Sequence, residues 1–353
     1  MQSNINQRDN TFDVAKGIAI ILMCIGHTNC PKGLCEFIYM FHMAFFFMAS
    51  GWFFNLNNLS DFRGYVWKKV KGLWWPFVTW GTAFILLHNW FRDVGLISMD
   101  NAEYSLRDIV WKTCTTITRF IPTEDMMGPY WFLSSLFYVS IGAWCVFWVA
   151  GKTRHSVVTA AVIFAALYCA AWADIYFGIG LGTKMCITFC AMAIFYVSYI
   201  LHQGGYLLEI IKRHVLTCVF IPLCILFLFR YFGYGHISIP SLEMQNPLLF
   251  IIYSICGFVM LLAISTSLHK VMWMEKMLAY VGRNTLVILL ANILCRNIVE
   301  LLILKVTGYA GDISDVYEMY PQWYVWIGYT VFMLVMPLLI NEVFERTKKL
   351  IIS

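Results

Sequence analysis

The sequence has few charged residues for its length. Of its 353 residues, 13% are Asp, Glu, Lys or Arg, whereas 60% are hydrophobic. About a quarter of the residues of an average soluble domain are charged, and so small a share cannot cover the surface of a soluble protein of this size. The composition therefore excludes a soluble domain and predicts an all-α, polytopic membrane protein.

The motifs of several large enzyme classes are also absent. The chain has no Gly-rich phosphate loop, no HExxH zinc motif and no GxSxG nucleophile motif, which argues against the enzyme classes that use them. No metal is expected. We find no internal repeat, low-complexity segment or linker, so residues 1–353 are expected to form one transmembrane domain.

The 12 cysteines include no CxxC pair, and most lie in apolar segments, where Cys behaves as a small hydrophobe. Cys30 and Cys35 differ because they flank a predicted turn. Whether they form a disulfide depends on an oxidising compartment and stays open. Residues 1–11 are polar and no small-residue cleavage site follows, so the first apolar helix is expected to direct insertion.

Ten apolar runs are long enough to cross a membrane. A helix that spans the hydrocarbon core of about 30 Å needs roughly 20 apolar residues. The runs cover residues 12–30, 36–54, 73–91, 129–150, 157–178, 184–202, 215–232, 247–268, 284–304 and 323–345. The sequence therefore predicts about ten transmembrane helices.

Basic residues concentrate in the loops that follow the even-numbered runs. These loops contain Arg63, Lys68, Lys69, Lys71, Lys152, Arg154, Lys212, Arg213, Lys270, Lys276, Arg283, Arg346, Lys348 and Lys349. Lys and Arg are enriched in cytoplasmic loops, so both termini of this multi-pass protein are expected on the cytoplasmic side of the inner (plasma) membrane. The net charge of +5 comes from these loops and does not indicate a nucleic-acid partner.

Residues 92–128 form the longest predicted external segment. The apolar period around Ile109, Trp111 and Ile117 predicts a surface helix within it. Long ordered loops often carry function. One interpretation is a lid over the external mouth of a site, and the other is a cap that only packs.

Residues 12–54 combine two apolar helices with ionisable side chains, which are costly inside a membrane and are functional candidates by default. The first helix carries Asp13, Lys16 and His27, and the second carries His42. At about 100° per residue, Lys16 and His27 lie within roughly 20° of the same helix face and ~16 Å apart along the axis. Asp13, one turn before Lys16, shares that face and can pair with it.

Five motifs carry a family resemblance. They are Lys16–His27 (KGIAIILMCIGH), Phe41–Gly51 (FHMAFFFMASG), Lys68–Pro76 (KKVKGLWWP), Gly128–Leu133 (GPYWFL) and Val281–Leu286 (VGRNTL). In this order they resemble the acyltransferase-3 family of integral membrane O-acyltransferases, with the most specific motifs in the first ~80 residues. Two positions depart from the family pattern, since Ala44 stands where many members have Pro and Asn292 where many have His.

The resemblance implies about ten membrane helices and transfer of an acyl group to a hydroxyl of a cell-surface or lipid-linked glycan. The usual group is acetyl, with acetyl-CoA as the co-substrate. The expected partners are acyl-CoA, a carbohydrate acceptor and the lipid bilayer, and a homo-oligomer stays open. Without an attached soluble hydrolase-like domain, the chain resembles a stand-alone member.

Within this resemblance, His27 is the expected catalytic residue. Neutral imidazole can take the proton of a sugar hydroxyl near neutral pH, and a covalent acyl-imidazole relay is the alternative. Lys16 is expected to bind the donor or organise the site, and His42 to orient His27 or bind substrate. The alternatives are a purely structural pair of Lys16 with Asp13 and a structural hydrogen bond of His42.

Positive charge on the cytoplasmic side is expected to bind the phosphates of acyl-CoA. The basic residues nearest the family motifs are Arg63, Lys68, Lys69, Lys71 and Arg283. The alternative for each is that it serves only to orient the protein in the membrane.

Four residues are candidates for binding the acceptor on the external side. They are Glu36, Glu124, Asp125 and Trp131. Carboxylates accept hydrogen bonds from sugar hydroxyls, and Trp131 can stack on a sugar ring. The alternatives are ordinary surface acids and, for Trp131, an interfacial anchor.

A transporter or channel with a polar pathway along Lys16 and His27 is the alternative function, because buried charges also mark ion pathways. Transporters often contain inverted repeats or paired broken helices, and the sequence shows neither. An inactive membrane scaffold is a third interpretation.

Overall fold

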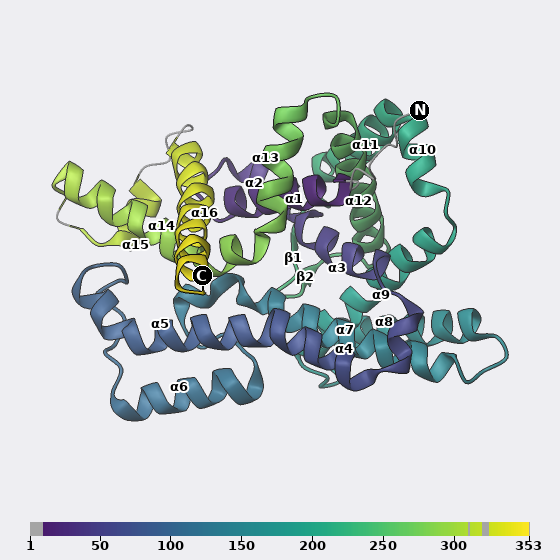
Figure 1. Cartoon of the computed structure of the whole chain (residues 1–353), viewed down its shortest axis with the longest axis horizontal. Coiled ribbons are helices and arrows are strands. Elements are labelled where there is room, and N and C mark those ends of the chain that lie inside the picture. The colour runs from purple at the N-terminus through teal and green to yellow at the C-terminus, as the bar shows by residue number, and fades with distance from the viewer. Residues whose placement is uncertain (1–9, 310, 320–324, 353) are drawn as a thin grey trace.

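The computed structural model describes residues 10–309, 311–319 and 325–352. Helices dominate this part of the chain, and its one sheet is a hairpin of two short strands (Figure 1). The predicted polytopic, all-α fold is confirmed. Residues 323 and 324, predicted at the start of the last span, lie outside the described residues.

The elements follow one another in a simple order. The first half of the chain contains α1 (Thr11–Gly26), α2 (Lys32–Tyr39), α3 (His42–Trp52), the 3₁₀-helix η1 (Leu56–Ser60), α4 (Phe62–Lys69), the π-helix η2 (Val70–Trp74), α5 (Trp75–Asp93), α6 (Leu106–Arg119), the 3₁₀-helix η3 (Asp125–Tyr130), α7 (Trp131–Ala150) and α8 (Ser156–Phe177). The second half contains α9 (Thr183–Gln203), α10 (Leu207–Arg213), α11 (Val215–Tyr231), β1 (Ile237–Ser238), β2 (Glu243–Met244), α12 (Pro247–Leu268), α13 (Met272–Arg283), α14 (Thr285–Thr307), α15 (Ile313–Met319) and α16 (Val325–Ile352).

Each of the ten predicted spans coincides with a helix or a pair of helices. Among the described residues, seven spans are long and apolar enough to cross a membrane, or eight if the pair α10–α11, bent by 102°, counts as one. The helices α1 and α5 are not in this set. α1 has only 16 residues, and α5 ends in the polar residues His88, Asn89, Arg92 and Asp93.

The second predicted span, residues 36–54, is interrupted in the structure. α2 ends at Tyr39 and α3 begins at His42, with Phe41 between them in a non-helical conformation (φ −144°, ψ −24°). No proline lies at this break. The interruption places His42 in the first turn of a new helix, where its side chain faces the end of α1.

α1 lies in the middle of the molecule and contacts α3, α12, α13, α14 and α16 (Figure 1). The backbones of α1 and α13 lie especially close to each other. A Cβ at Gly17 would overlap the carbonyl of Leu278, and a Cβ at Gly282 would overlap the carbonyl of Asp13. Glycine at both positions allows the two backbones to meet. Residues 269–283, predicted as a loop because the segment has no long apolar run, thus contain the helix α13.

The segment 92–128 contains α6, the surface helix that the apolar period predicts. Ser105 accepts a hydrogen bond from the backbone N–H of Asp108, and the Asp108 carboxylate accepts one from Ser105 in return, which caps the helix. The hydrogen bonds from Ser105 hold the pKa of Asp108 below its ordinary value. α6 runs beside α5 at one edge of the molecule (Figure 1).

Candidate active site

One face of α1 lines two separate cavities. Lys16 and Ile20 line the first cavity, and Met23 and His27 line the second. Successive spacings of four, three and four residues keep these side chains on one side of the helix. The common face predicted for Lys16 and His27 is therefore present, but the two side chains open into different spaces.

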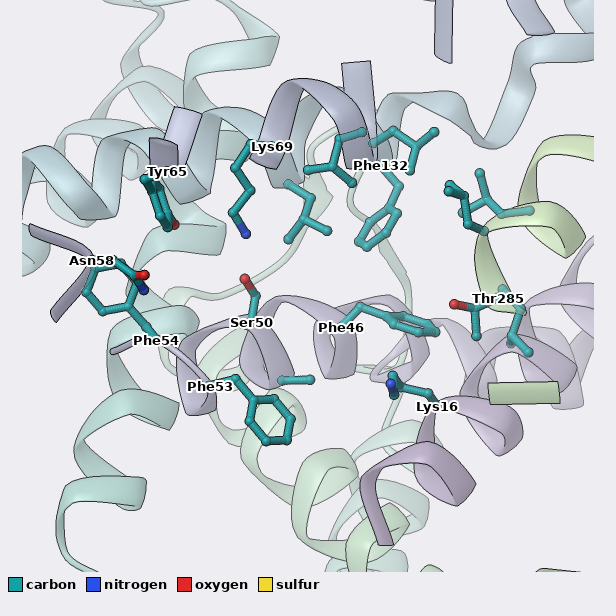
Figure 2. Close-up of a pocket in the computed structure, with 18 residues that line it drawn as sticks. Lys16, Phe46, Ser50, Phe53, Phe54, Asn58, Tyr65, Lys69, Phe132 and Thr285 are labelled. Carbon is teal, nitrogen blue, oxygen red and sulfur yellow. The ribbon is translucent and has the colours of Figure 1, made fainter. Parts of the chain in front are cut away.

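The first cavity has a volume of about 390 Å³ and lies between α1, α3, α4 and α7. Its walls are mainly apolar and include Phe46 and Phe132. Figure 2 shows Lys69 reaching from α4 toward Ser50 of α3, with Lys16 further along the same cavity. Two cations within apolar walls suit a ligand that combines negative charge with an apolar arm.

Lys16 and Arg283 share the carboxylate of Asp13. Lys16 Nζ lies 2.7 Å from Asp13 Oδ1, and Arg283 Nε lies 3.3 Å from Asp13 Oδ2. Asp13 is buried, and a buried carboxylate needs such partners. The predicted pair of Asp13 with Lys16 is confirmed, and it holds Lys16 at the wall of the first cavity.

Lys69 is the second cation of the first cavity. Its Nζ lies 5.4 Å from the centre of the Tyr65 ring, within the range of a cation–π contact. Burial lowers the pKa of Lys69 to about 8 because the charged ammonium loses contact with water. The charge of Lys69 therefore changes near pH 8.

The second cavity has a volume of about 70 Å³ and lies at the C-terminal end of α1. His27, Tyr39, His42 and Trp131 line it on one side, and residues 237–240 of the β-hairpin cover the other. One water molecule needs roughly 10–15 Å³ measured in this way, so the cavity has room for a few waters. A larger acceptor requires the hairpin to move.

The two imidazoles of the second cavity are held differently. His42 Nδ1 donates to the carbonyl of Ile38 at 2.8 Å, so in the neutral ring Nε2 keeps a lone pair. The His42 ring stacks on Tyr39 with centroids 5.2 Å apart, and the Tyr39 hydroxyl donates to the carbonyl of Gly26 at 2.8 Å. By contrast, none of the described residues hydrogen-bonds to the ring of His27. Both of its ring nitrogens are available to a substrate.

An apolar layer separates the two cavities. The residues at the boundary, in α1, α3 and α7, are Ile20, Met23, Met43, Phe46, Trp131 and Phe132. Along α1 and α3, the residues that line one cavity lie about one helical turn, or about 5 Å, from the residues that line the other. The barrier between the cavities is therefore thin and made of side chains.

Comparison with known proteins identifies the family. A family model described as an acyltransferase domain, that of the acyltransferase-3 family, matches residues 9–342. The chain belongs to the acyltransferase-3 family. It is therefore a multi-pass membrane protein with an acyltransferase domain, and the resemblance drawn from its motifs is confirmed.

A curated relative supports this membership. Nodulation protein NolL of Mesorhizobium japonicum (strain LMG 29417 / CECT 9101 / MAFF 303099) is 28% identical to this acyltransferase over 144 residues. The match covers 37% of this chain and 34% of the relative, so the chain spans about a third of the relative's length. No solved structure matches the chain. Within the described ranges, no group of three or more His, Cys, Asp or Glu residues is arranged to hold a metal ion.

The predicted donor-binding residues of the acyltransferase lie in three places. Lys69 lines the first cavity. Arg63, Lys68 and Lys71 are exposed on α4 and η2. Arg283 lies at the N-terminal end of α1, where it contacts Asp13. Of this group, Lys69 is therefore the residue that lines the first cavity together with Lys16.

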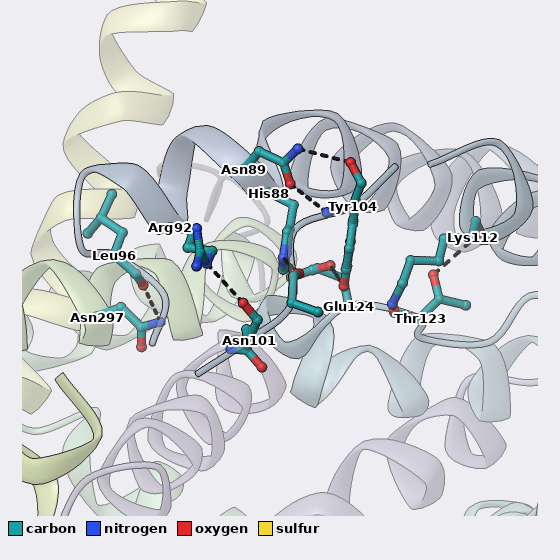
Figure 3. Close-up of polar contacts among 11 residues, drawn as sticks. His88, Asn89, Arg92, Leu96, Asn101, Tyr104, Lys112, Thr123, Glu124 and Asn297 are labelled. Carbon is teal, nitrogen blue, oxygen red and sulfur yellow. Dashed lines mark hydrogen bonds and ion pairs between the residues drawn. The ribbon is translucent and has the colours of Figure 1, made fainter. Parts of the chain in front are cut away.

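Glu124, a predicted acceptor ligand, is buried in a hydrogen-bond network (Figure 3). Its Oε1 accepts from His88 Nδ1 at 2.9 Å, and its Oε2 accepts from the Tyr104 hydroxyl at 2.6 Å. The rings of His88 and Tyr104 stack with centroids 3.4 Å apart. Both oxygens of Glu124 have partners, and the network ties the segment 92–128 to α5.

The other three predicted acceptor ligands lie apart from one another. Trp131 lines the second cavity together with His27. Glu36 accepts a hydrogen bond from Arg230 Nη2 at 2.8 Å, which joins α2 to α11. Asp125 lines a third cavity on the far side of η3. Trp131 is thus the one of these three that the fold brings to His27.

The sequence analysis did not select three features of the site. Tyr39 and the hairpin gave no signal, because tyrosines are common near membrane surfaces and residues 233–246 contain no recognisable motif. Arg296, which lines the third cavity, did give one. It is a charge inside a predicted span, the same signal that selected Lys16. Nearby, Cys30 and Cys35 are free thiols, and Cys35 Sγ donates to the carbonyl of Gly26 at 3.8 Å.

Proposed function

We propose that this acyltransferase moves an acetyl group from cytoplasmic acetyl-CoA to a hydroxyl of a cell-surface or lipid-linked glycan, in the inner (plasma) membrane. One observation carries the proposal. The ring of His27 faces its own cavity without a hydrogen-bond partner among the described residues, on the same helix face as Lys16. One helix thus serves a donor cavity and an acceptor cavity.

The first cavity is the donor site in this proposal. The pattern of basic loops argues that this end of α1 faces the cytoplasm, where acyl-CoA is made. A volume of about 390 Å³ is suited to the arm of coenzyme A rather than to the whole molecule, since small-molecule pockets measure roughly 300–1,000 Å³. Lys16 and Lys69 bind phosphate or the thioester oxygen, and the exposed Arg63, Lys68 and Lys71 hold the nucleotide end.

The acetyl group has to pass the apolar layer between the two cavities. The layer is about 5 Å thick and contains the flexible side chains of Met23 and Met43. A narrow thioester arm can displace such side chains, whereas a hydrated ion would lose its water without replacement ligands. This favours acyl transfer over the transport alternative.

His27 acts on the acetyl group in one of two ways. As a general base it takes the proton of the acceptor hydroxyl, the oxygen attacks the thioester carbonyl, and coenzyme A leaves as the thiol with that proton. As a relay, its unprotonated nitrogen attacks the carbonyl first and coenzyme A leaves as the thiolate. The acceptor oxygen then takes the acetyl group from the imidazole, the proton of the hydroxyl is released, and the thiolate takes up a proton. In both cases His42, whose Nε2 keeps a lone pair in the same cavity, binds the acceptor hydroxyl, and Trp131 contacts the sugar.

The test is the acetyl content of the cell's own surface glycan. A deletion strain carrying the wild-type gene should restore O-acetyl groups, and a strain carrying His27→Ala should not. His155→Ala is the matched control, because His155 is exposed beyond the end of α7. Purified His27→Ala protein should still bind acetyl-CoA. Full O-acetylation in the His27→Ala strain would remove the basis of the proposal.

A further inference from the structure

A third cavity lies near the second one and is lined mainly by polar side chains. Its volume is about 300 Å³. It is formed by α14, the loop after α5, the start of η3 and the start of α15. The polar residues that line it are Ser98, Asn101, Asp125, Arg296, Asn297, Glu300 and Ser314. Neither the catalytic proposal nor the family motifs account for this cavity.

Glu300 is the most informative residue of the third cavity. It is only 2% exposed, and its Oε1 lies 3.4 Å from Arg296 Nε. That oxygen nevertheless accepts no hydrogen bond from the described residues. Buried polar atoms are nearly always hydrogen-bonded, and leaving one without a partner is costly. Glu300 thus brings to the wall of the cavity a carboxylate whose hydrogen-bonding capacity the described residues do not use up.

The walls of the third cavity are fixed by hydrogen bonds. Asn297 Nδ2 donates to the carbonyl of Leu96 at 3.0 Å (Figure 3), and Arg296 Nη2 donates to Asn297 Oδ1 at 3.2 Å. Asp312 accepts a hydrogen bond from the Ser98 hydroxyl at 2.6 Å, which joins the start of α15 to the loop after α5. The donors and acceptors of the cavity are therefore preorganised.

The third cavity is next to the catalytic one. η3 connects the two, because Asp125 at its start lines the third cavity and Pro129 near its end lines the His27 cavity. A 3₁₀-helix rises by about 2 Å per residue, so these two positions are separated by ~8 Å. Both cavities therefore lie along η3, and a ligand that reaches from one to the other has to span roughly 8 Å.

We propose that the third cavity is a sugar-binding subsite, which holds a hydroxyl-rich unit of the acceptor adjacent to the unit that is acetylated at His27. Asp125 and Glu300 accept hydrogen bonds from sugar hydroxyls, and Arg296 and Asn101 donate to sugar oxygens. The volume is at the lower end of the roughly 300–1,000 Å³ range of ligand pockets, which suits one sugar unit. This inference rests on the proposed function, because it takes the ligand to be one unit of the glycan acceptor.

Sugar binding is measured on the purified full-length protein in detergent, without acetyl-CoA. The probes are the methyl glycosides of glucose, galactose, mannose and N-acetylglucosamine at millimolar concentration, followed by saturation-transfer difference NMR. At least one probe should receive saturation from the wild-type protein. Glu300→Gln keeps the shape and removes the charge, and it should weaken binding roughly tenfold, the loss expected for one charged hydrogen bond.

A blocking variant makes the test independent of Glu300. Ser314 is exposed at the edge of the cavity, so Ser314→Trp should fill the entrance without unfolding the protein and abolish the NMR signal. Thr118→Trp is the matched control on the exposed face of α6 and should bind as the wild type does. An unchanged melting temperature shows that each variant is folded.

The outcomes separate this inference from the proposed function. No saturation transfer to any of the four glycosides, or equal transfer to wild type and Ser314→Trp, would overturn the subsite whether or not the protein transfers acetyl groups. Sugar binding that is lost in Ser314→Trp would support the subsite even if acetyl transfer were never found.

Discussion

Lys16 and Lys69 hold their charges in different ways, although both line the first cavity, the proposed donor site. Lys16 is paired with Asp13 at 2.7 Å, so its charge is compensated before any ligand arrives. Lys69 faces the Tyr65 ring at 5.4 Å and has a pKa lowered to about 8 by burial. Lys69 is therefore the cation that gains most from a phosphate, and its protonation should control donor binding.

Donor affinity should fall as the pH rises through 8. Below pH 8 Lys69 carries its proton and attracts phosphate, and above pH 8 the free protein has lost that charge. Isothermal titration with acetyl-CoA should show weaker binding at pH 9 than at pH 7, with proton uptake on binding near pH 8. Lys69→Met should weaken binding roughly ten- to a hundredfold and flatten this pH dependence.

The matched control for Lys69 is Lys152→Met. Lys152 lies outside the cavity, with its Nζ 3.2 Å from the centre of the Trp148 ring, and its removal should leave the affinity and the pH profile as they are. A wild-type pH profile in Lys69→Met would show that another group senses the pH.

His42 should contribute to the chemical step and not to donor binding, because it lines the cavity of His27 and not that of Lys16. His42→Asn can keep a donor for the Ile38 carbonyl but loses the imidazole. We expect kcat to fall by roughly a hundredfold, within the usual range for loss of an acid–base group, with an unchanged Kd for acetyl-CoA. A weakened Kd with a normal kcat would move His42 to the donor site.

At the level of elements, the contact of α1 with α13 sets the position of Lys16. Gly17 and Gly282 let the two helices meet at Leu278 and Asp13, and α13 then brings Arg283 to the Asp13 carboxylate. Gly282 therefore helps to position the site by allowing α13 to pack against α1. In the sequence, its motif Val281–Leu286 indicated only the family resemblance.

Gly282→Val should destabilise the protein, because the new side chain overlaps the Asp13 carbonyl. Overpacking of this kind costs about 1–3 kcal/mol, so the melting temperature in detergent should fall and Arg283 should separate from Asp13. Gly328→Val in α16 is the matched control, since nothing lies within 4 Å of a Cβ there. Equal melting temperatures for the two variants would mean that α1 and α13 do not pack as described.

The segment 92–128 is a second element whose role the contacts clarify. A lid has to detach, but this segment is bound to α5 through Glu124, His88 and Tyr104 in a largely buried network. Asn89 adds a further pair of hydrogen bonds with the backbone of Tyr104. These contacts favour the packing cap over the lid. The β-hairpin at residues 237–240, which covers His27, is the better candidate for a moving cover.

For the whole molecule, the sequence predicts the helices well and their interruptions poorly. Apolar runs of about 20 residues specify membrane helices through a strong energetic requirement, and among the described residues each predicted run coincides with a helix or a pair of helices. The break at Phe41 and the helix α13 have no such signature, because they depend on which neighbours the segments meet. Short amphipathic pieces and turns within apolar runs are therefore missed.

The site likewise combines features that the sequence predicts with features that depend on tertiary contacts. The spacing of Lys16 and His27 predicts their common helix face, since a helix fixes it locally. Other features come from tertiary contacts, and residue type does not reveal them. The separation of the two cavities, the selection of Lys69 over Lys68 and the burial of Glu124 all belong to this group.

In the proposed function, an acetyl group supplied on one face of the membrane reaches an acceptor on the other face through His27. Inside-out membrane vesicles test it directly, because acetyl-CoA labelled in its acetyl group then meets only the cytoplasmic face. Wild-type vesicles and His155→Ala vesicles should transfer label to glycan inside the vesicle, and His27→Ala vesicles should not, although they still bind the donor. Labelling of the glycan at the wild-type rate in His27→Ala vesicles would show that acetyl transfer does not depend on His27.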